Sequence, residues 1–203
     1  MENTLNQEQF EHIKEAAAEG FARAQFNLAL CYHHGDFVEK NFAEALKWYQ
    51  KSADQGNMNA AYTLAMMYYK GDEMPRDMEK AFHYFEIASK KGHTMARHYL
   101  AECYTFGQGT EQNFEQAAAW YTQAAEKNNL DSMVNLGICY TEGLGVEQDY
   151  AKAFYWFELA ADKGYAAAEY NLGLCYLNGE GVEADEEKAI DYFMRAAKQE
   201  LSD

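Results

Sequence analysis

The fold of this chain is decided by residues 168–197, which read AEYNLGLCYLNGEGVEADEEKAIDYFMRAA. The glycine at 179 in this stretch recurs at every earlier step of 36 residues, as Gly143, Gly107, Gly71 and Gly35. At a background glycine frequency of roughly 7%, the chance probability of four such matches is on the order of 10⁻⁵. Columns of leucine, tyrosine and alanine keep the same step: Leu28, Leu64, Leu100, Leu136 and Leu172; Tyr32, Tyr68, Tyr104, Tyr140 and Tyr176; Ala45, Ala81, Ala117, Ala153 and Ala189. A register without insertions predicts a repeat protein.

Each period predicts two helices joined by a glycine turn. In the first period, small and apolar residues around Leu28 recur at helical spacing, and Gly35 ends that helix. Asn41 then caps a second helix, and Asp77, Asn113, Asp149 and Asp185 repeat the cap. The second helices end at Gly56, Gly92, Asn128 and Gly164, where Asn is the other residue that tolerates a left-handed backbone. We therefore expect paired helices near 22–34 and 42–54 and at every 36-residue step.

The N-terminal segment, residues 5–20, carries the apolar pattern of a second helix alone. We expect it to be half a repeat that covers the open face of the first full repeat. The predicted organisation is one continuous all-α domain with a capping helix, five repeats and a short tail. Its parts are 1–20, 21–56, 57–92, 93–128, 129–164 and 165–203.

Two blocks of the quoted stretch carry a resemblance to a known family. They are A-x-Y-N-L-G-L-C-Y-x-x-G-x-G-V-x-x-D at 168–185 and K-A-x-x-Y-F-x-x-A-A at 188–197, and residues 132–164 match nearly as well. Over residues 21–200 and the half repeat, the chain resembles the Sel-like repeat (SLR) family, which is related to tetratricopeptide repeats. The resemblance implies a right-handed superhelical α-solenoid. It also implies an adaptor that holds other proteins together, often in bacteria.

Some secreted members of that family join two cysteines, eight residues apart, in each repeat. Here the second cysteine is missing throughout, because its positions hold Glu39, Pro75, Glu111, Glu147 and Glu183. The disulfide-bearing group is therefore excluded, and the resemblance implies a cytoplasmic-type member. The four cysteines lie in one column and are interpreted as small, reduced core residues: Cys31, Cys103, Cys139 and Cys175.

The composition limits the kind of partner. The chain has 203 residues, a formal net charge of −16, 48% apolar and 25% charged residues, which is typical of a globular protein. Strong acidity disfavours nucleic acid and anionic membranes and favours neutral or basic protein partners. Neither a signal-peptide pattern nor an apolar run of about 18 residues is found, so we expect a cytoplasmic protein without membrane insertion.

The motifs of common enzymes are missing. No serine begins a Ser-x-x-Lys motif, and Gly-x-Ser-x-Gly, a phosphate loop and His-Glu-x-x-His are absent. The Gly-x-Gly triplets at 107–109, 143–145 and 179–181 fall in predicted turns and are interpreted as turn devices. The six histidines are interpreted as exposed capping residues: His12, His33, His34, His83, His93 and His98. We expect no enzyme, no cofactor and no metal site.

The candidate binding face is the concave side, which the first helix of each pair lines in tetratricopeptide stacks. The columns that start at positions 26 and 30 are mostly apolar. Two interpretations stay open, namely contact between adjacent repeats or a groove for a partner helix or extended peptide. The columns at 33 and 34 vary most and are the best candidates for specificity. The candidate partner-binding residues are His33, His34, Tyr62, Met66, Tyr69, Arg97, His98, Tyr99, Glu102, Phe106, Asn135 and Asn171.

The third repeat departs from the column pattern twice, one helical turn apart. His98 replaces an aromatic residue or Val, and Glu102 replaces Leu, Met or Ile. Residues at i and i+4 touch, so the two side chains can hydrogen-bond. One interpretation is a His–Glu pair that satisfies itself. The other is that Glu102 anchors a basic residue of a peptide partner, with these residues around it: Tyr62, Met66, Tyr69, His98 and Phe106.

The last repeat has apolar residues in columns that would face a sixth repeat: Tyr170, Leu174, Leu177 and Met194. This end predicts either a homodimer or a docked partner. Taken whole, the sequence predicts a non-enzymatic protein-interaction scaffold that binds a peptide or partner helix on its concave face. The alternative is an enzyme or small-molecule binder with a site in the groove, which a deep pocket with shifted pKa values would favour.

Overall fold

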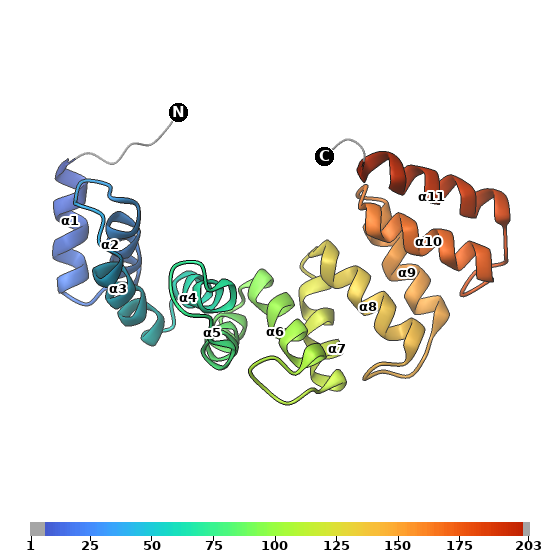
Figure 1. Cartoon of the computed structure of the whole chain (residues 1–203), viewed down its shortest axis with the longest axis horizontal. Coiled ribbons are helices and arrows are strands. Elements are labelled where there is room, and N and C mark those ends of the chain that lie inside the picture. The colour runs from blue at the N-terminus through green and yellow to red at the C-terminus, as the bar shows by residue number, and fades with distance from the viewer. Residues whose placement is uncertain (1–6, 201–203) are drawn as a thin grey trace. The chain divides into compact units, whose positions relative to one another are not determined.

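Every regular element of the described chain, residues 7–200, is an α-helix. The computed structural model describes these residues and, at Glu200, the backbone alone. The helices (Figure 1) are α1 Gln7–Ala18, α2 Ala22–His34, α3 Phe42–Asp54, α4 Met58–Lys70, α5 Met78–Lys90, α6 Thr94–Phe106, α7 Phe114–Ala125, α8 Leu130–Glu142, α9 Tyr150–Ala161, α10 Ala166–Asn178 and α11 Glu186–Glu200. The prediction of an all-α fold is confirmed.

The helix bounds keep the step that the sequence predicts. The first helices of the repeats begin at residues 22, 58, 94, 130 and 166, and the second helices begin at 42, 78, 114, 150 and 186. The helices predicted at 22–34 and 42–54 occupy those residues, so the helix–turn–helix repeat is confirmed. The right-handed winding of the whole array stays a prediction.

The predicted caps fix where each second helix begins. The side chain of Asn41 accepts a hydrogen bond from the backbone N–H of Glu44 at 3.1 Å. The equivalent caps in the later repeats make the same bond: Asp77, Asn113, Asp149 and Asp185. Such a cap contributes about 1 kcal/mol of stability, which explains why this column holds only Asn and Asp. Asn128 has a φ of 63°, the left-handed conformation that was expected of it.

The described chain divides into two compact units. Unit 1 comprises the residues up to 96 together with 108–110, and unit 2 comprises 97–107 together with the residues from 111 onwards. Helices α1 to α5 therefore belong to unit 1 and α7 to α11 to unit 2, as can be followed in Figure 1. The expectation of one continuous domain stays a prediction.

In unit 1, helix α1 covers the first full repeat. Phe10 and Ala17 of α1 are only 2% and 1% exposed, and they pack with Leu28 and Cys31 of α2. The exposed residues of α1 are mostly polar or charged and include Glu8, Glu11, His12 and Glu15. The helix therefore combines an apolar inner side with a polar outer side, and its role as a capping helix stays a prediction.

The Gly-x-Gly turns allow a close approach between neighbouring repeats. Gly145 has a φ of 69°, and a Cβ added to it would lie 2.0 Å from the carbonyl oxygen of Phe114. Gly109 approaches the carbonyl oxygen of Met78 equally closely, also at 2.0 Å. Only glycine fits both the backbone conformation and this contact. The geometry supports the interpretation of these triplets as turn devices.

All four cysteines are buried and unpaired. Burial raises the pKa of their thiols, to about 12 for Cys103 and to about 11 for Cys139. Thiols of this kind stay protonated at neutral pH and are poor nucleophiles. The interpretation of the cysteine column as small core residues is confirmed.

Candidate functional site

His98 of α6 is a buried polar residue whose hydrogen-bonding partner lies on the next first helix, α8. The residue is 6% exposed, and its Nδ1 lies 3.0 Å from Oγ of Ser132. Ser132 stands in a column that is otherwise alanine: Ala24, Ala60, Ala96 and Ala168. Two departures from the repeat pattern, one repeat apart, thus satisfy each other. A buried polar group needs such a partner, so the serine explains how the histidine is accommodated.

The predicted pair of His98 and Glu102 forms only a loose contact. Nε2 of His98 lies 3.6 Å from Oε1 of Glu102, which is longer than a hydrogen bond. Burial lowers the pKa of His98, so the imidazole is neutral at pH 7. Nδ1 of His98 bonds to Ser132 and Nε2 keeps the loose contact with Glu102, so the interpretation that the two residues satisfy each other stays a prediction.

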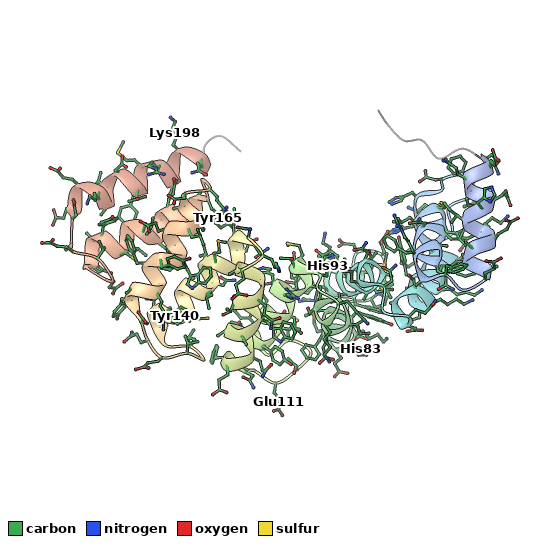
Figure 2. All side chains as sticks on the ribbon, turned by 180° about the vertical axis from the view of Figure 1, so that it is seen from behind. His83, His93, Glu111, Tyr140, Tyr165 and Lys198 are labelled. Carbon is green, nitrogen blue, oxygen red and sulfur yellow. The ribbon has the colours of Figure 1, made fainter. Side chains whose placement is uncertain are left out.

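Glu102 is a half-buried carboxylate with a second carboxylate nearby. Its side chain is 26% exposed. Burial raises its pKa, and the charge of Asp131 raises it further. Asp131 lies in the first turn of α8 and accepts a hydrogen bond from the hydroxyl group of Tyr165. Tyr165, which directly precedes α10, is labelled in Figure 2. The charge of Asp131 therefore disfavours the ionised form of Glu102.

These side chains line a half-open hollow of about 230 Å³ on unit 2, which we call the acidic hollow. Its lining residues come from α6, α8 and α10 and from the residue before α10: His98, Glu102, Asp131, Val134, Asn135, Tyr165 and Ala167. No lysine or arginine belongs to the described lining. The hollow is smaller than the usual site for a whole small molecule and suits the end of one long side chain.

Ser132, His98 and Glu102 stand in the order of a nucleophile, a base and an acid. In hydrolases such a serine must meet its substrate directly. Ser132 is 0% exposed and lies behind the histidine. A substrate carbonyl cannot reach its hydroxyl oxygen, so the arrangement joins two helices and does not present a nucleophile.

A second hollow, of about 310 Å³, lies on unit 1, and we call it the methionine hollow. Its lining residues are His33, Tyr62, Thr63, Met66, Met67, Lys70, Asp72 and Glu73. The Nδ1 atom of His33 lies 3.1 Å from the hydroxyl oxygen of Tyr49, and Nε2 lies 2.8 Å from Oε1 of Glu73. This hollow combines apolar side chains with charges of both signs.

The interpretation of the histidines as exposed caps is wrong for His98 and His33. His98 is buried, and His33 is held between Tyr49 and Glu73. His93 accepts the backbone N–H of Ala96 at 3.2 Å, so it caps the start of α6 and not the end of a helix. His34, which is exposed at the end of α2, stacks on the ring of His33.

Of the residues predicted around Glu102, only His98 lines the acidic hollow. Tyr62 and Met66 line the methionine hollow of unit 1. Tyr69 lies edge-on to Phe85, with ring centroids 6.0 Å apart. Phe106, at the end of α6, is 64% exposed.

The four remaining candidates on the first helices differ in their contacts. Arg97 and Tyr99, on either side of His98, are half-buried. Asn135 joins the acidic hollow. Asn171 donates a hydrogen bond to the carbonyl oxygen of Ala167 in its own helix, at 2.7 Å, so part of its hydrogen-bonding capacity is used locally.

The column at position 33 is less free than the sequence suggests. His33 contacts the hydroxyl group of Tyr49, and Oγ1 of Thr105 lies 3.2 Å from the hydroxyl group of Tyr121. In both repeats the polar residue of this column serves a tyrosine that the other repeats replace with phenylalanine. The polar residues of this column therefore have a structural task as well.

Sequence reasoning missed Asp131 and Tyr165. Their columns hold unrelated residues, which are Arg23, Asn59, Met95 and Ala167 for the first and Phe21, Asn57, His93 and Asn129 for the second. The signal lies in their combination, since the hydroxyl group in one repeat meets the carboxylate of the repeat before it. A column-by-column comparison does not detect such pairs.

Residues 7–200 contain neither a membrane-spanning helix nor a metal-binding cluster. No helix in that range is both long and apolar enough to span a bilayer. No group of three or more His, Cys, Asp and Glu side chains there has the arrangement of a metal site.

Comparison with known proteins places the chain in a family. Five stretches match the Sel1 repeat: residues 22–57, 59–93, 94–129, 130–165 and 166–201. The chain belongs to the Sel1 repeat family. The resemblance found in the sequence is thereby confirmed. Sel1 repeat proteins generally mediate protein–protein interactions and are typically non-enzymatic scaffolds.

Two solved structures show the closeness of this Sel1 repeat protein to others. A Sel1 repeat protein from Oxalobacter formigenes is 29% identical, with a TM-score of 0.85 over 95% of this chain and 79% of that one. The protein c5321, a protective antigen present in uropathogenic Escherichia coli strains, is 29% identical, with a TM-score of 0.84 over 94% of this chain. This chain spans 41% of the length of c5321. None of the curated proteins matches it.

Proposed function

We propose that this Sel1 repeat protein is a non-enzymatic scaffold that binds a peptide or a partner helix on the face of its first helices. The acidic hollow receives a lysine or arginine side chain of that partner. One observation carries the proposal: two carboxylates, Glu102 and Asp131, stand at a half-open hollow whose described lining has no lysine or arginine.

A bound cation would relieve an unfavourable arrangement. In the free protein, burial and the charge of Asp131 both disfavour the ionised form of Glu102. An ammonium or guanidinium group between the two carboxylates would stabilise both charges, and it would act in a partly desolvated place where such pairs are stronger than at an open surface. The gain on binding is therefore larger than for an exposed ion pair.

The rest of the surface supports a partner of this kind. The net charge of −16 attracts basic partners over a distance and raises their rate of association. Asn135 lies beside the acidic hollow and can donate and accept hydrogen bonds to a peptide backbone. The same charge disfavours nucleic acid, and four buried, unpaired thiols support a cytoplasmic setting.

The alternative, an enzyme or small-molecule binder, has less support. His98 and Glu102 do have shifted pKa values, which is a property of many active sites. Ser132, the nucleophile that their arrangement would serve, is fully buried. The hollow is also shallow and small, so its shape favours contact with a side chain over the enclosure of a substrate.

A peptide array tests the proposal. Immobilised peptides with random flanks carry Arg, Lys, Gln or Glu at a fixed central position, and the purified protein is the probe. We expect binding to Arg and Lys peptides to exceed binding to Gln peptides by roughly tenfold or more. Glu102→Gln should remove that preference while the helical circular dichroism stays unchanged.

The control is Glu158→Gln, which removes an exposed carboxylate from α9, a second helix. It removes one negative charge, as Glu102→Gln does, and should keep the preference. Equal binding to Arg, Lys and Gln peptides would contradict the proposal. If the control also loses the preference, the overall charge of the protein and not the acidic hollow causes it.

A further inference from the structure

The last residue of α6, Phe106, is an exposed aromatic side chain one helical turn beyond Glu102. It is 64% exposed. Its column is polar or charged in every other repeat: His34, Lys70, Glu142 and Asn178. Single exposed apolar residues are common on protein surfaces, so exposure alone assigns Phe106 no task. Its position relative to the acidic hollow is what distinguishes it.

Phe106 belongs to a row of three residues in which α6 departs from the repeat pattern. His98, Glu102 and Phe106 follow one another at steps of four residues, and neighbours in such a row have Cβ atoms about 5–6 Å apart. All three belong to unit 2. The row turns gradually outward, since His98 is buried, the side chain of Glu102 is 26% exposed and Phe106 is 64% exposed. It therefore leads from the lining of the acidic hollow onto the surface beside it.

The end of α6 that carries Phe106 is held in place by hydrogen bonds. The side-chain amide of Gln112 donates to the carbonyl oxygen of Thr105 at 2.8 Å. Oγ1 of Thr105 donates to the carbonyl oxygen of Ala101 at 2.9 Å and lies 3.2 Å from the hydroxyl oxygen of Tyr121. The backbone next to Phe106 is thus fixed, and a group on a fixed backbone loses little conformational freedom when a partner covers it.

We infer that Phe106 contacts an apolar side chain of the partner, close to the basic residue that the acidic hollow receives. This inference rests on the proposed function, because the basic residue sets the register of the partner on α6. The partner is then a peptide or helix that carries one basic residue and one apolar residue, such as Leu, Ile, Met or Phe, at a fixed spacing. Covering the ring removes apolar surface from water, which favours binding.

The geometry of α6 limits that spacing. Positions about 5–6 Å apart on α6 match residues two positions apart in an extended peptide, which are roughly 6.6 Å apart, or three to four positions apart in a helix. The residue directly next to the basic residue points to the opposite side of an extended peptide. Phe106 also lies on only one side of Glu102 along α6. For a partner bound in one direction, the apolar residue therefore stands on only one side of the basic residue in the partner's sequence.

A second peptide array tests the inference. Each immobilised peptide has arginine at its centre and either leucine or serine at one chosen flanking position, with serine and glycine elsewhere. We expect leucine to strengthen binding by roughly fivefold or more at one of these spacings, and on one side of the arginine only. Phe106→Ser should remove the preference for leucine and keep the preference for arginine over glutamine at the centre. Phe106→Leu, which retains an apolar side chain, should keep both preferences.

The matched control is Tyr155→Ser, which removes an aromatic side chain that is 54% exposed on α9, a second helix. It should keep both preferences. Phe106 and Tyr155 are exposed, so the circular dichroism of all three variants should match that of the unchanged protein.

The possible outcomes separate this inference from the proposed function. A preference for arginine without a preference for leucine at these spacings would overturn the inference and leave the proposed function intact. Loss of the arginine preference in Phe106→Ser would also overturn it, because the ring would then contact the basic residue itself. Equal binding of arginine and glutamine peptides to the unchanged protein would overturn the proposed function, and this inference with it.

Discussion

The methionine hollow and the acidic hollow share the columns at 26, 27 and 30 and differ in the rest of their lining. In repeat two, the columns at 26 and 30 supply Tyr62 and Met66, and in repeat three they supply His98 and Glu102. These side chains occupy equivalent backbone positions in the two repeats, but they are apolar or aromatic in one repeat and polar in the other. The difference teaches that the repeat determines where a hollow forms, and two side chains per repeat determine what it accepts.

The two hollows also differ in how their charges are balanced. In the methionine hollow, Glu73 lies 2.8 Å from His33, and Lys70 is close by in the lining. In the acidic hollow, Glu102 and Asp131 share a place with a histidine that burial keeps neutral. The first suits an apolar side chain, and the second suits a cation from outside.

The largest loss of stability is expected for substitutions in the Gly-x-Gly turns, which occur in both units. Gly109→Ala in unit 1 and Gly145→Ala in unit 2 each force a Cβ to within 2.0 Å of a carbonyl oxygen, at a positive φ. Each should lower the free energy of unfolding by on the order of 3 kcal/mol or more, as measured by urea denaturation. A loss of free energy of unfolding below about 1 kcal/mol in either unit would show that the two turns are not equivalent. The two hollows could then not be compared as products of the same repeat.

A smaller loss of stability is expected for Ser132→Ala, which removes a buried hydrogen bond next to the acidic hollow. Ser132→Ala removes the hydrogen-bonding partner of Nδ1 of His98 and should lower the free energy of unfolding by about 1–3 kcal/mol. Thr63→Ala in the methionine hollow is the control, because Thr63 only bonds the carbonyl oxygen of Asn59 in its own helix. It should change stability by less than about 0.5 kcal/mol. Equal losses would mean that His98 is not held by the serine.

The repeat itself could be predicted because its signals are local and repeated. Asn41, Gly35 and Leu28 each act within one or two turns of helix, and five copies make their columns unmistakable. The cap then predicts where a helix begins, and the glycine predicts where a helix ends. The division into two compact units had no such signal, because it depends on packing between helices.

The site could be predicted only in part. His98 and Glu102 stood out because each breaks a column. Their partners did not, because Ser132 is a small residue among small residues and Asp131 lies in a column without a pattern. The hydrogen-bonding partner of His98 is therefore a residue that no sequence pattern singles out.

The smallest expected effect is a difference in melting temperature between variants of Glu102 and of Glu73. The pKa of Glu102 is raised in the folded protein above its ordinary value of 4.5, so its ionisation destabilises the fold at neutral pH. Glu102→Gln should therefore slightly raise the melting temperature at pH 7. The gain should shrink as the pH falls through the raised pKa towards 4.5, because the carboxyl group then becomes protonated in the folded protein as well.

Glu73→Gln should not stabilise the protein, because it weakens the contact with His33. Melting curves of both variants between about pH 4 and 7.5 check the contrast, since this window includes the ordinary pKa of glutamate. A melting temperature that falls for Glu102→Gln at pH 7 would mean that the carboxylate is paired within the protein. The charges of the acidic hollow would then be paired within the protein, as Glu73 is with His33 in the methionine hollow.

The most direct test of the central claim is a double-mutant cycle by isothermal titration calorimetry. It combines Glu102→Gln with replacement of the central arginine by glutamine in the strongest peptide of the array. Each single change should weaken binding by roughly tenfold, and both together should weaken it little more than one, because they remove the same contact. Losses that simply add would contradict the account, since the arginine would then bind somewhere other than the acidic hollow.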